Sequence, residues 1–287
     1  MGIRTILAAV SDGAATSGTI HLACQLARRF SAHVEGYHVM PDPVEALPPG
    51  DGIGIPPHIG LIETMLADAE AKAGEARAYF EKLVASYKIP RGGPPQIAPA
   101  GPSAKWQEAA GAAAALVARR GRFFDLVILG RSDRVIHEPH SDTIEEVLMR
   151  SGRPALLAPA ETSSRIGYMV ALAWNGSPEA VRALAAGMPF LEKADAVSLI
   201  TGGDPDRLGA PQVLEYLAWH GINAQHQRLP GGSARDVGEK LIDTAREASA
   251  DLLIMGGYGH APWREFLFGG ATRTAVATMP MPLLLVH

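Results

Sequence analysis

The chain has 287 residues, of which 47% are hydrophobic and 20% charged, and its formal net charge is −4 with a pI near 6.2. This length suggests two domains of ordinary size, and the composition is that of a globular protein. The weakly negative charge, without a long run of basic residues, argues against nucleic acid as a direct partner, and no apolar stretch reaches the ~20 residues of a membrane span.

The first residues of the chain run directly into a strand-like segment at 6–10 and contain no small-residue cleavage site. We therefore expect a cytoplasmic protein rather than a secreted one. The single cysteine, Cys24, excludes an intrachain disulfide and lies in an apolar stretch typical of a buried helix. A reactive role for this thiol is not expected.

Short apolar runs alternate with amphipathic stretches through the first half of the chain. In order, the pattern predicts a strand at 6–10, a helix at 16–30, a strand at 33–39, a proline- and glycine-rich loop at 41–60, a helix at 61–87, a strand at 96–99, a helix at 103–120 and a strand at 125–130. The loop cannot be regular structure, so we expect it at the surface.

The second half repeats this alternation. It predicts strands at 170–174, 196–201, 224–229, 251–255 and 283–286, and helices at 178–191, 211–220 and 234–249. Ser177 is expected to cap the first of these helices, with Pro178 at its first position. Strands that alternate with helices indicate a parallel sheet covered on both faces.

Two pairs of matching segments show that the sequence contains an internal repeat. Residues 125–130 (DLVILG) match residues 251–256 (DLLIMG), and residues 153–158 (RPALLA) match residues 281–286 (MPLLLV). The repeat predicts two similar domains, at 1–160 and 165–287, with a short linker between them.

A cluster of small residues separates the last two strands. It has the pattern G-x2-G-x9-G and consists of Gly256, Gly259, Gly269, Gly270, Ala271 and Thr272. Glycines let backbone N–H groups approach an anion, and a helix start adds unpaired donors and the positive end of its dipole. The pattern therefore predicts a phosphate site.

This spacing and position resemble the ATP-binding type of universal stress protein. The resemblance implies an α/β fold of two tandem doubly wound parallel five-stranded sheets with strand order 3-2-1-4-5, of the adenine nucleotide alpha hydrolase-like class. It implies ATP or a related adenine nucleotide, with Mg, as the ligand of the second domain. It also implies that residues 155–159 and 283–287 pair inside the chain as a pseudo-dimer, and it allows a homodimer of whole chains.

In that strand order the ligand crevice lies between the first and fourth strands. In the second half this crevice is formed by the Asn175-Gly176 turn and the loop at 256–272. The resemblance implies that Ile200 presents its backbone to the adenine. Asn175 stands where family members carry Asp, so hydrogen bonding is kept and the charge is lost.

Further residues of the loop extend this site. Arg264 suits bidentate contact with phosphate, and His260 lies nearby. The family usually has Ser or Thr directly after the third glycine, where this chain has Gly270, so we expect Thr272 to supply the hydroxyl.

The first half departs from the motif. Asp133 replaces the second glycine, and Ser141 stands in place of Gly269. A carboxylate facing phosphates repels them, so we expect no ATP binding of the family type here. Only the turn at 11–13 keeps a family-like sequence. His137, Glu138, His140 and Asp142 are better interpreted as a solvated loop than as metal ligands.

The expected function is therefore nucleotide binding and regulation in a stress response, with weak ATPase activity at most, because no general base or metal-holding carboxylate pair is evident. Two alternatives remain. In the first, the protein is an enzyme that uses His260 and Arg264. In the second, it is an interaction scaffold whose glycines serve only to let chain segments pack closely.

Overall fold

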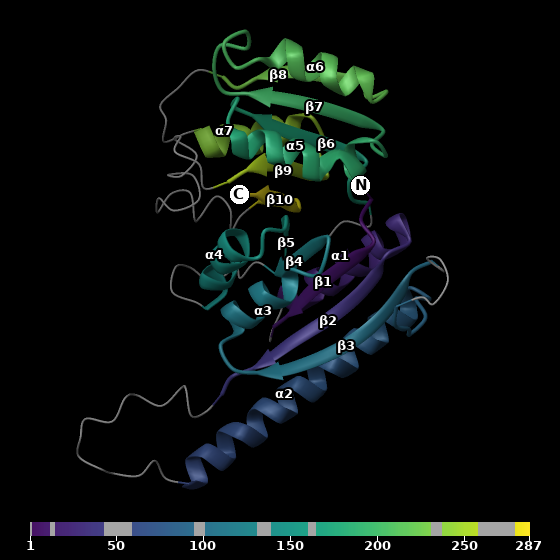
Figure 1. Ribbon diagram of the computed structural model, residues 1–287, viewed down its shortest axis with the longest axis vertical. Coiled ribbons are helices and arrows are strands. Elements are labelled where there is room, and N and C mark those ends of the chain that lie inside the picture. The colour runs from purple at the N-terminus through teal and green to yellow at the C-terminus, as the bar shows by residue number, and fades with distance from the viewer. Residues whose placement is uncertain are drawn as a thin grey trace, which may run out of the picture.

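Strands and helices alternate through both halves of the chain (Figure 1). The computed structural model describes residues 2–11, 15–42, 59–94, 101–130, 139–159, 165–230, 237–257 and 279–287. The first half contains β1 (Thr5–Val10), α1 (Ala15–Phe30), β2 (His33–Met40), α2 (Ile59–Ser86), β3 (Ser103–Ala110), α3 (Ala113–Gly121), β4 (Leu126–Gly130), α4 (Pro139–Arg150) and β5 (Ala155–Ala158). The second contains β6 (Met169–Trp174), α5 (Pro178–Leu191), β7 (Ala196–Thr201), α6 (Ala210–Trp219), β8 (Ala224–Arg228), α7 (Val237–Glu247), β9 (Leu252–Gly256) and β10 (Leu283–Val286).

The strands form one ten-stranded sheet with the order β3-β2-β1-β4-β5-β10-β9-β6-β7-β8. Within each half all pairs are parallel and the order is 3-2-1-4-5, which confirms the predicted fold. The halves meet where β5 and β10 pair antiparallel, with Leu156 opposite Leu284. This confirms the predicted pairing of last strands inside the chain, and it covers two sheet edges that would otherwise be open.

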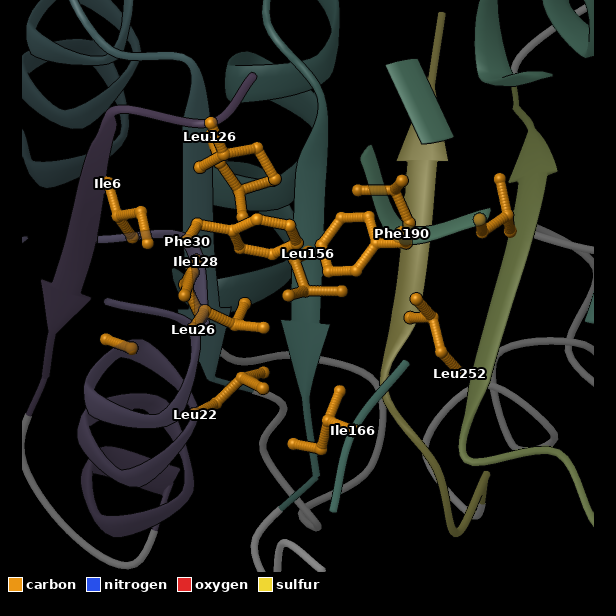
Figure 2. Close-up of a cluster of buried hydrophobic side chains, with 14 of the residues drawn as sticks. Ile6, Leu22, Leu26, Phe30, Leu126, Ile128, Leu156, Ile166, Phe190 and Leu252 are labelled. Carbon is orange, nitrogen blue, oxygen red and sulfur yellow. The ribbon is translucent and has the colours of Figure 1, made fainter. Parts of the chain in front are cut away.

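Each face of the sheet carries one hydrophobic core that extends through both halves. Side chains of α1, α2, α5 and α6 form the core on one face, and side chains of α3, α4 and α7 form it on the other. On the first face Phe30, Leu156 and Phe190 meet near the junction, as Figure 2 shows. The halves therefore share their buried surface, and burial of apolar area, the main stabilising term, crosses the junction.

The repeated aspartates explain why the same sequence opens β4 and β9. Asp125 accepts hydrogen bonds at Oδ2 from the backbone N–H groups of Arg4 and Thr5, at 2.8 and 3.0 Å. Asp251 accepts them at Oδ1 from Gly167 and Tyr168, at 2.7 and 3.0 Å. In each half the carboxylate fastens the start of the central strand to its neighbour.

A test of this arrangement uses the pH dependence of stability. Burial raises the pKa of Asp251 above its usual 3.8, against the opposing hydrogen bonds from Met169, Tyr168 and Gly167 and the charge of Arg29. A raised folded-state pKa contributes stability that is complete below the unfolded pKa and is lost as pH rises through the folded value. The side chain at position 251 cannot titrate in Asp251→Asn. The difference in free energy of unfolding between this variant and wild type, measured in urea, should therefore become smaller between pH 4 and pH 7.

The exposed Asp243, which contacts Arg246, provides the matched control. Asp243→Asn should leave the pH profile of the unfolding free energy close to that of wild type. A deficit of Asp251→Asn that grows toward pH 7 would show that the hydrogen bonds outweigh the cost of burial, contrary to this interpretation.

One predicted helix is wrong at its start. Residues 103–120 were expected to be helical, but Ser103–Ala110 is strand β3, and the helix α3 begins at Ala113. All eight residues of β3 pair with β2, and the Trp106 ring contacts Phe80 at a centroid distance of 5.2 Å. Long-range pairing thus overrides local helix propensity, and Gly111, at φ 131°, separates strand from helix. The strand expected at 96–99 lies outside the described residues.

Cys24 is buried in α1, as predicted. Burial raises the pKa of its thiol to about 12, which leaves almost no reactive thiolate at neutral pH. Within the described ranges, no helix is both long and apolar enough to cross a membrane.

Candidate functional site

The candidate site lies at the carboxyl ends of β6 and β9, the point where the strand order of the second half reverses. The two strands run parallel and side by side, with Leu172 opposite Ile254. The Asn175-Gly176 turn follows β6, and Gly256 ends β9. Both chain segments adjoin the first turn of α5, so three of the predicted site residues are grouped at one edge of the sheet.

The start of α5 is built as the sequence predicts. Ser177 is the N-cap, its Oγ accepts a hydrogen bond from the N–H of Ala180 at 3.2 Å, and Pro178 occupies the first turn. Asn175 Oδ1 accepts a hydrogen bond from the N–H of Ser177 at 3.1 Å. Its Nδ2 group makes no hydrogen bond with any described residue, so the amide can offer N–H donors to a ligand.

The Asn175-Gly176 turn is held against the loop that follows β7. Gly176 has φ +75°, and a Cβ atom there would lie 3.4 Å from the backbone oxygen of Leu208. The same oxygen accepts a hydrogen bond from Trp174 Nε1 at 2.6 Å. Trp174 and Leu208 thereby hold the Asn175-Gly176 turn against this loop, a role that the sequence pattern did not reveal.

Gly256 has a packing role. A Cβ atom at this position would lie 2.5 Å from the carbonyl carbon of Glu179 and 2.6 Å from the nitrogen of Ala180. The absence of a side chain therefore allows the end of β9 to approach the backbone of α5. Because any larger residue would displace the helix, substitution of Gly256 cannot separate ligand binding from folding.

A carboxylate that belongs to none of the sequence motifs lies at the same edge. Glu179 is in the first turn of α5, and its Oε1 is 2.7 Å from Arg182. The pKa of Glu179 is lowered, first by a hydrogen bond from its own backbone N–H and further by Ser177 and Arg182, against the effect of burial. This negative charge in the first turn of α5 disfavours phosphate next to it.

Ile200 lies in β7, one residue before the strand ends. Its side chain is buried, and its backbone lies between Ala173 of β6 and Gln227 of β8. A contact between Ile200 and adenine, as predicted, would therefore involve the main chain.

Other predicted residues lie outside the described part of the chain. In the second half these are Gly259, His260, Arg264, Gly269, Gly270, Ala271 and Thr272. In the first half they are Asp12, Gly13, Asp133, His137 and Glu138, while Ser141 is in α4. The described ranges contain no group of three or more His, Cys, Asp or Glu residues that could hold a metal ion.

Comparison with family models gives a match in the C-terminal segment. Residues 233–287 match the model of the universal stress protein family. No curated protein gave a significant match. Among solved structures, a universal stress protein from Archaeoglobus fulgidus is similar over 98% of this chain and 97% of its own, with 14% identity and a TM-score of 0.70.

A second similar structure is a functionally unknown protein from Pseudomonas aeruginosa. It is 13% identical, with a TM-score of 0.51, and the match covers 99% of this chain and 92% of that one. At these identities the structural likeness shows the fold, and the family match covers the segment that contains the glycine motif.

Proposed function

We propose that the chain is a regulatory protein that binds ATP or a related adenine nucleotide, because residues 233–287 match the universal stress protein family and the whole chain is similar in fold to a universal stress protein. The nucleotide would bind at the carboxyl edge of β6 and β9. The observation that carries this proposal is the position of the glycine motif, which begins at Gly256, directly at the switch point of the second half.

The described residues suit the nucleoside end of the ligand. Asn175 can donate from its amide to an acceptor atom of a base or ribose, since its oxygen is already engaged by Ser177. An Asp at this position would instead accept. We therefore propose that a ligand acceptor, such as a ring nitrogen or a hydroxyl oxygen, lies against Asn175.

The phosphates would lie on the side of the crevice away from Glu179, toward the glycines at 269–270. Mg²⁺ usually reaches such sites bound to the phosphates themselves with few protein ligands, so it would enter with the nucleotide. Its charge would offset the negative field of the Glu179 carboxylate in the first turn of α5.

The experiment that tests this proposal is ATP titration calorimetry on wild type and Gly259→Asp, with chromatography of any nucleotide that copurifies. We expect about one ATP per chain, and we expect Gly259→Asp to abolish binding because it brings a carboxylate to the phosphates. The sequence of the first half has Asp133 at the matching position of the motif.

Gly93→Asp is the matched control. It adds the same charge in the first half, where a side chain at Gly93 would have open space around it, and it should bind ATP as wild type does. An absence of heat and of released nucleotide from wild type would rule out the ATP site and leave the glycines as packing elements.

Slow hydrolysis is a second candidate activity, which His260 and Arg264 would serve. It predicts phosphate release that falls in His260→Ala while ATP affinity stays near that of wild type. A cytoplasmic location and a homodimer of whole chains remain predictions. Light scattering, which measures molar mass, tests the homodimer. Because β5 and β10 already pair within the chain, the strands at the edges of the described sheet are β3 and β8.

A further inference from the structure

A groove with polar and apolar lining residues runs along α2 in the first half, far in sequence from the glycine motif. Two cavities of about 230 and 490 Å³ adjoin there, and Lys72 lines both. The smaller one lies at the end of β2 and is lined by His38 and Asp68. The larger one lies between the first turn of α1 and α2 and is lined by Ser17, Glu75 and Tyr79. Together they have the size of a small-molecule site.

His38 offers an unsatisfied polar atom to this groove. Its side chain is only 4% exposed, and its ring stacks on Trp106 with an interplanar angle of 15°. Nδ1 lies 2.9 Å from the carbonyl oxygen of Val10, so Nδ1 carries the proton and donates it. The Nε2 atom of the neutral ring is then an acceptor, and it has no hydrogen-bond partner among the described residues. Nε2 is not sealed off from the groove that His38 lines, so a ligand there can donate a hydrogen bond to it.

The remaining polar groups mix donors and acceptors. Lys72 Nζ is 2.7 Å from Asp68 Oδ2, and Ser17 Oγ is 2.8 Å from the hydroxyl oxygen of Tyr79. With Glu75, the lining carries two carboxylates and one ammonium group. Such a lining has no excess positive charge to attract a phosphate. Hydroxyl groups, which both donate and accept, suit it best.

The second half provides an internal comparison, because the strand register aligns the two halves. His38 pairs with Val10 at the end of β1, and Thr201 pairs with Trp174 at the end of β6. Thr201 Oγ1 is satisfied by His226 Nε2 at 2.9 Å. Trp174 in turn donates to the Leu208 carbonyl group, and α6 has 10 residues where α2 has 28. Thr201 thus has a hydrogen-bond partner within the second half, whereas the equivalent His38 of the first half faces a groove.

We propose that the groove between α1 and α2 binds a small, uncharged, hydroxyl-rich molecule of the sugar or polyol class. A hydroxyl group donates to His38 Nε2, and neighbouring hydroxyls donate to Glu75 and accept from Lys72. This site is independent of the nucleotide site in the second half, so the two halves bind different ligands.

The experiment is saturation-transfer NMR of the full-length protein with D-ribose, D-glucose and myo-inositol as probes, and with inorganic phosphate followed by ³¹P line width. Wild type should transfer saturation to at least one polyol and leave phosphate unaffected. His38→Asn keeps a donor for Val10 but removes the Nε2 acceptor, so affinity for that polyol should fall about tenfold. Glu75→Gln, which removes a carboxylate acceptor, should also weaken it.

Thr201→Val changes the equivalent position of the other half and should leave polyol binding unchanged. Polyol binding should also be equal in wild type and Gly259→Asp, so that failure of this proposal and failure of the ATP proposal are distinguishable. Three results would overturn the inference: no polyol signal from wild type, a signal that His38→Asn does not weaken, or phosphate broadening that polyols do not affect.

Discussion

Replacing Phe190 by alanine should lower the free energy of unfolding by about 4 kcal/mol. The Phe190 side chain is fully buried, and its ring meets the edge of Phe30 at a centroid distance of 5.1 Å. Phe30 ends α1 in the first half and Phe190 lies in α5 in the second, so the lost contact crosses the junction (Figure 2). Urea unfolding followed by circular dichroism measures the change.

Phe123→Ala is the control for this experiment. Phe123 is 73% exposed, and its removal should change stability by less than about 0.5 kcal/mol. Because each core extends through both halves, Phe190→Ala should also keep a single unfolding transition. Two separate transitions, of which only one moved, would show that the halves fold independently and would contradict the shared core.

Replacing Arg29 by alanine should cost about 3 kcal/mol, since hydrogen bonds from a charged group contribute about 1.5 to 3 kcal/mol each and leave unpaired acceptors when lost. The guanidinium group donates to the backbone oxygens of Ile166, Gly167 and Lys193, at 3.2, 2.9 and 2.7 Å. It also stacks 4.0 Å above the Tyr168 ring. All four partners belong to the second half, so this one side chain fastens α1 to the start of β6 and the end of α5.

Arg28 is the neighbouring control, because it carries the same charge on the exposed side of α1. Arg28→Ala should be nearly neutral in the same urea experiment. Equal effects of the two substitutions would mean that the loss of positive charge at the end of the helix, rather than the contacts across the junction, sets the stability.

The sequence predicted most of the fold because its signals were local and repeated. The matched segments at 125–130 and 251–256 located β4 and β9, and Ser177 with Pro178 marked the start of α5. Strand β3 escaped prediction because its alanine, lysine and glutamate residues favour a helix locally. Only pairing with β2, which is distant in the sequence, makes it a strand.

The candidate site was predictable to a similar extent. Residue types identified Asn175, Gly176 and Gly256, since turns and close backbone approaches require such residues. The contact between Trp174 and Leu208 was not predictable, because it depends on how the loop after β7 folds back. The open Nε2 atom of His38 was equally hidden, since only the neighbouring Val10 carbonyl decides which ring nitrogen is engaged.

The antiparallel contact between β5 and β10 has an evolutionary consequence. In a symmetric dimer of identical subunits, a mutation in the gene alters both binding sites at once. In this chain the two subunit equivalents are encoded separately and cannot dissociate on dilution. Each can therefore carry its own substitutions, and the two copies of the glycine motif do differ, with Asp133 in one where the other has Gly259. Joining the two subunit equivalents in one chain thus allows one site to change without changing the other.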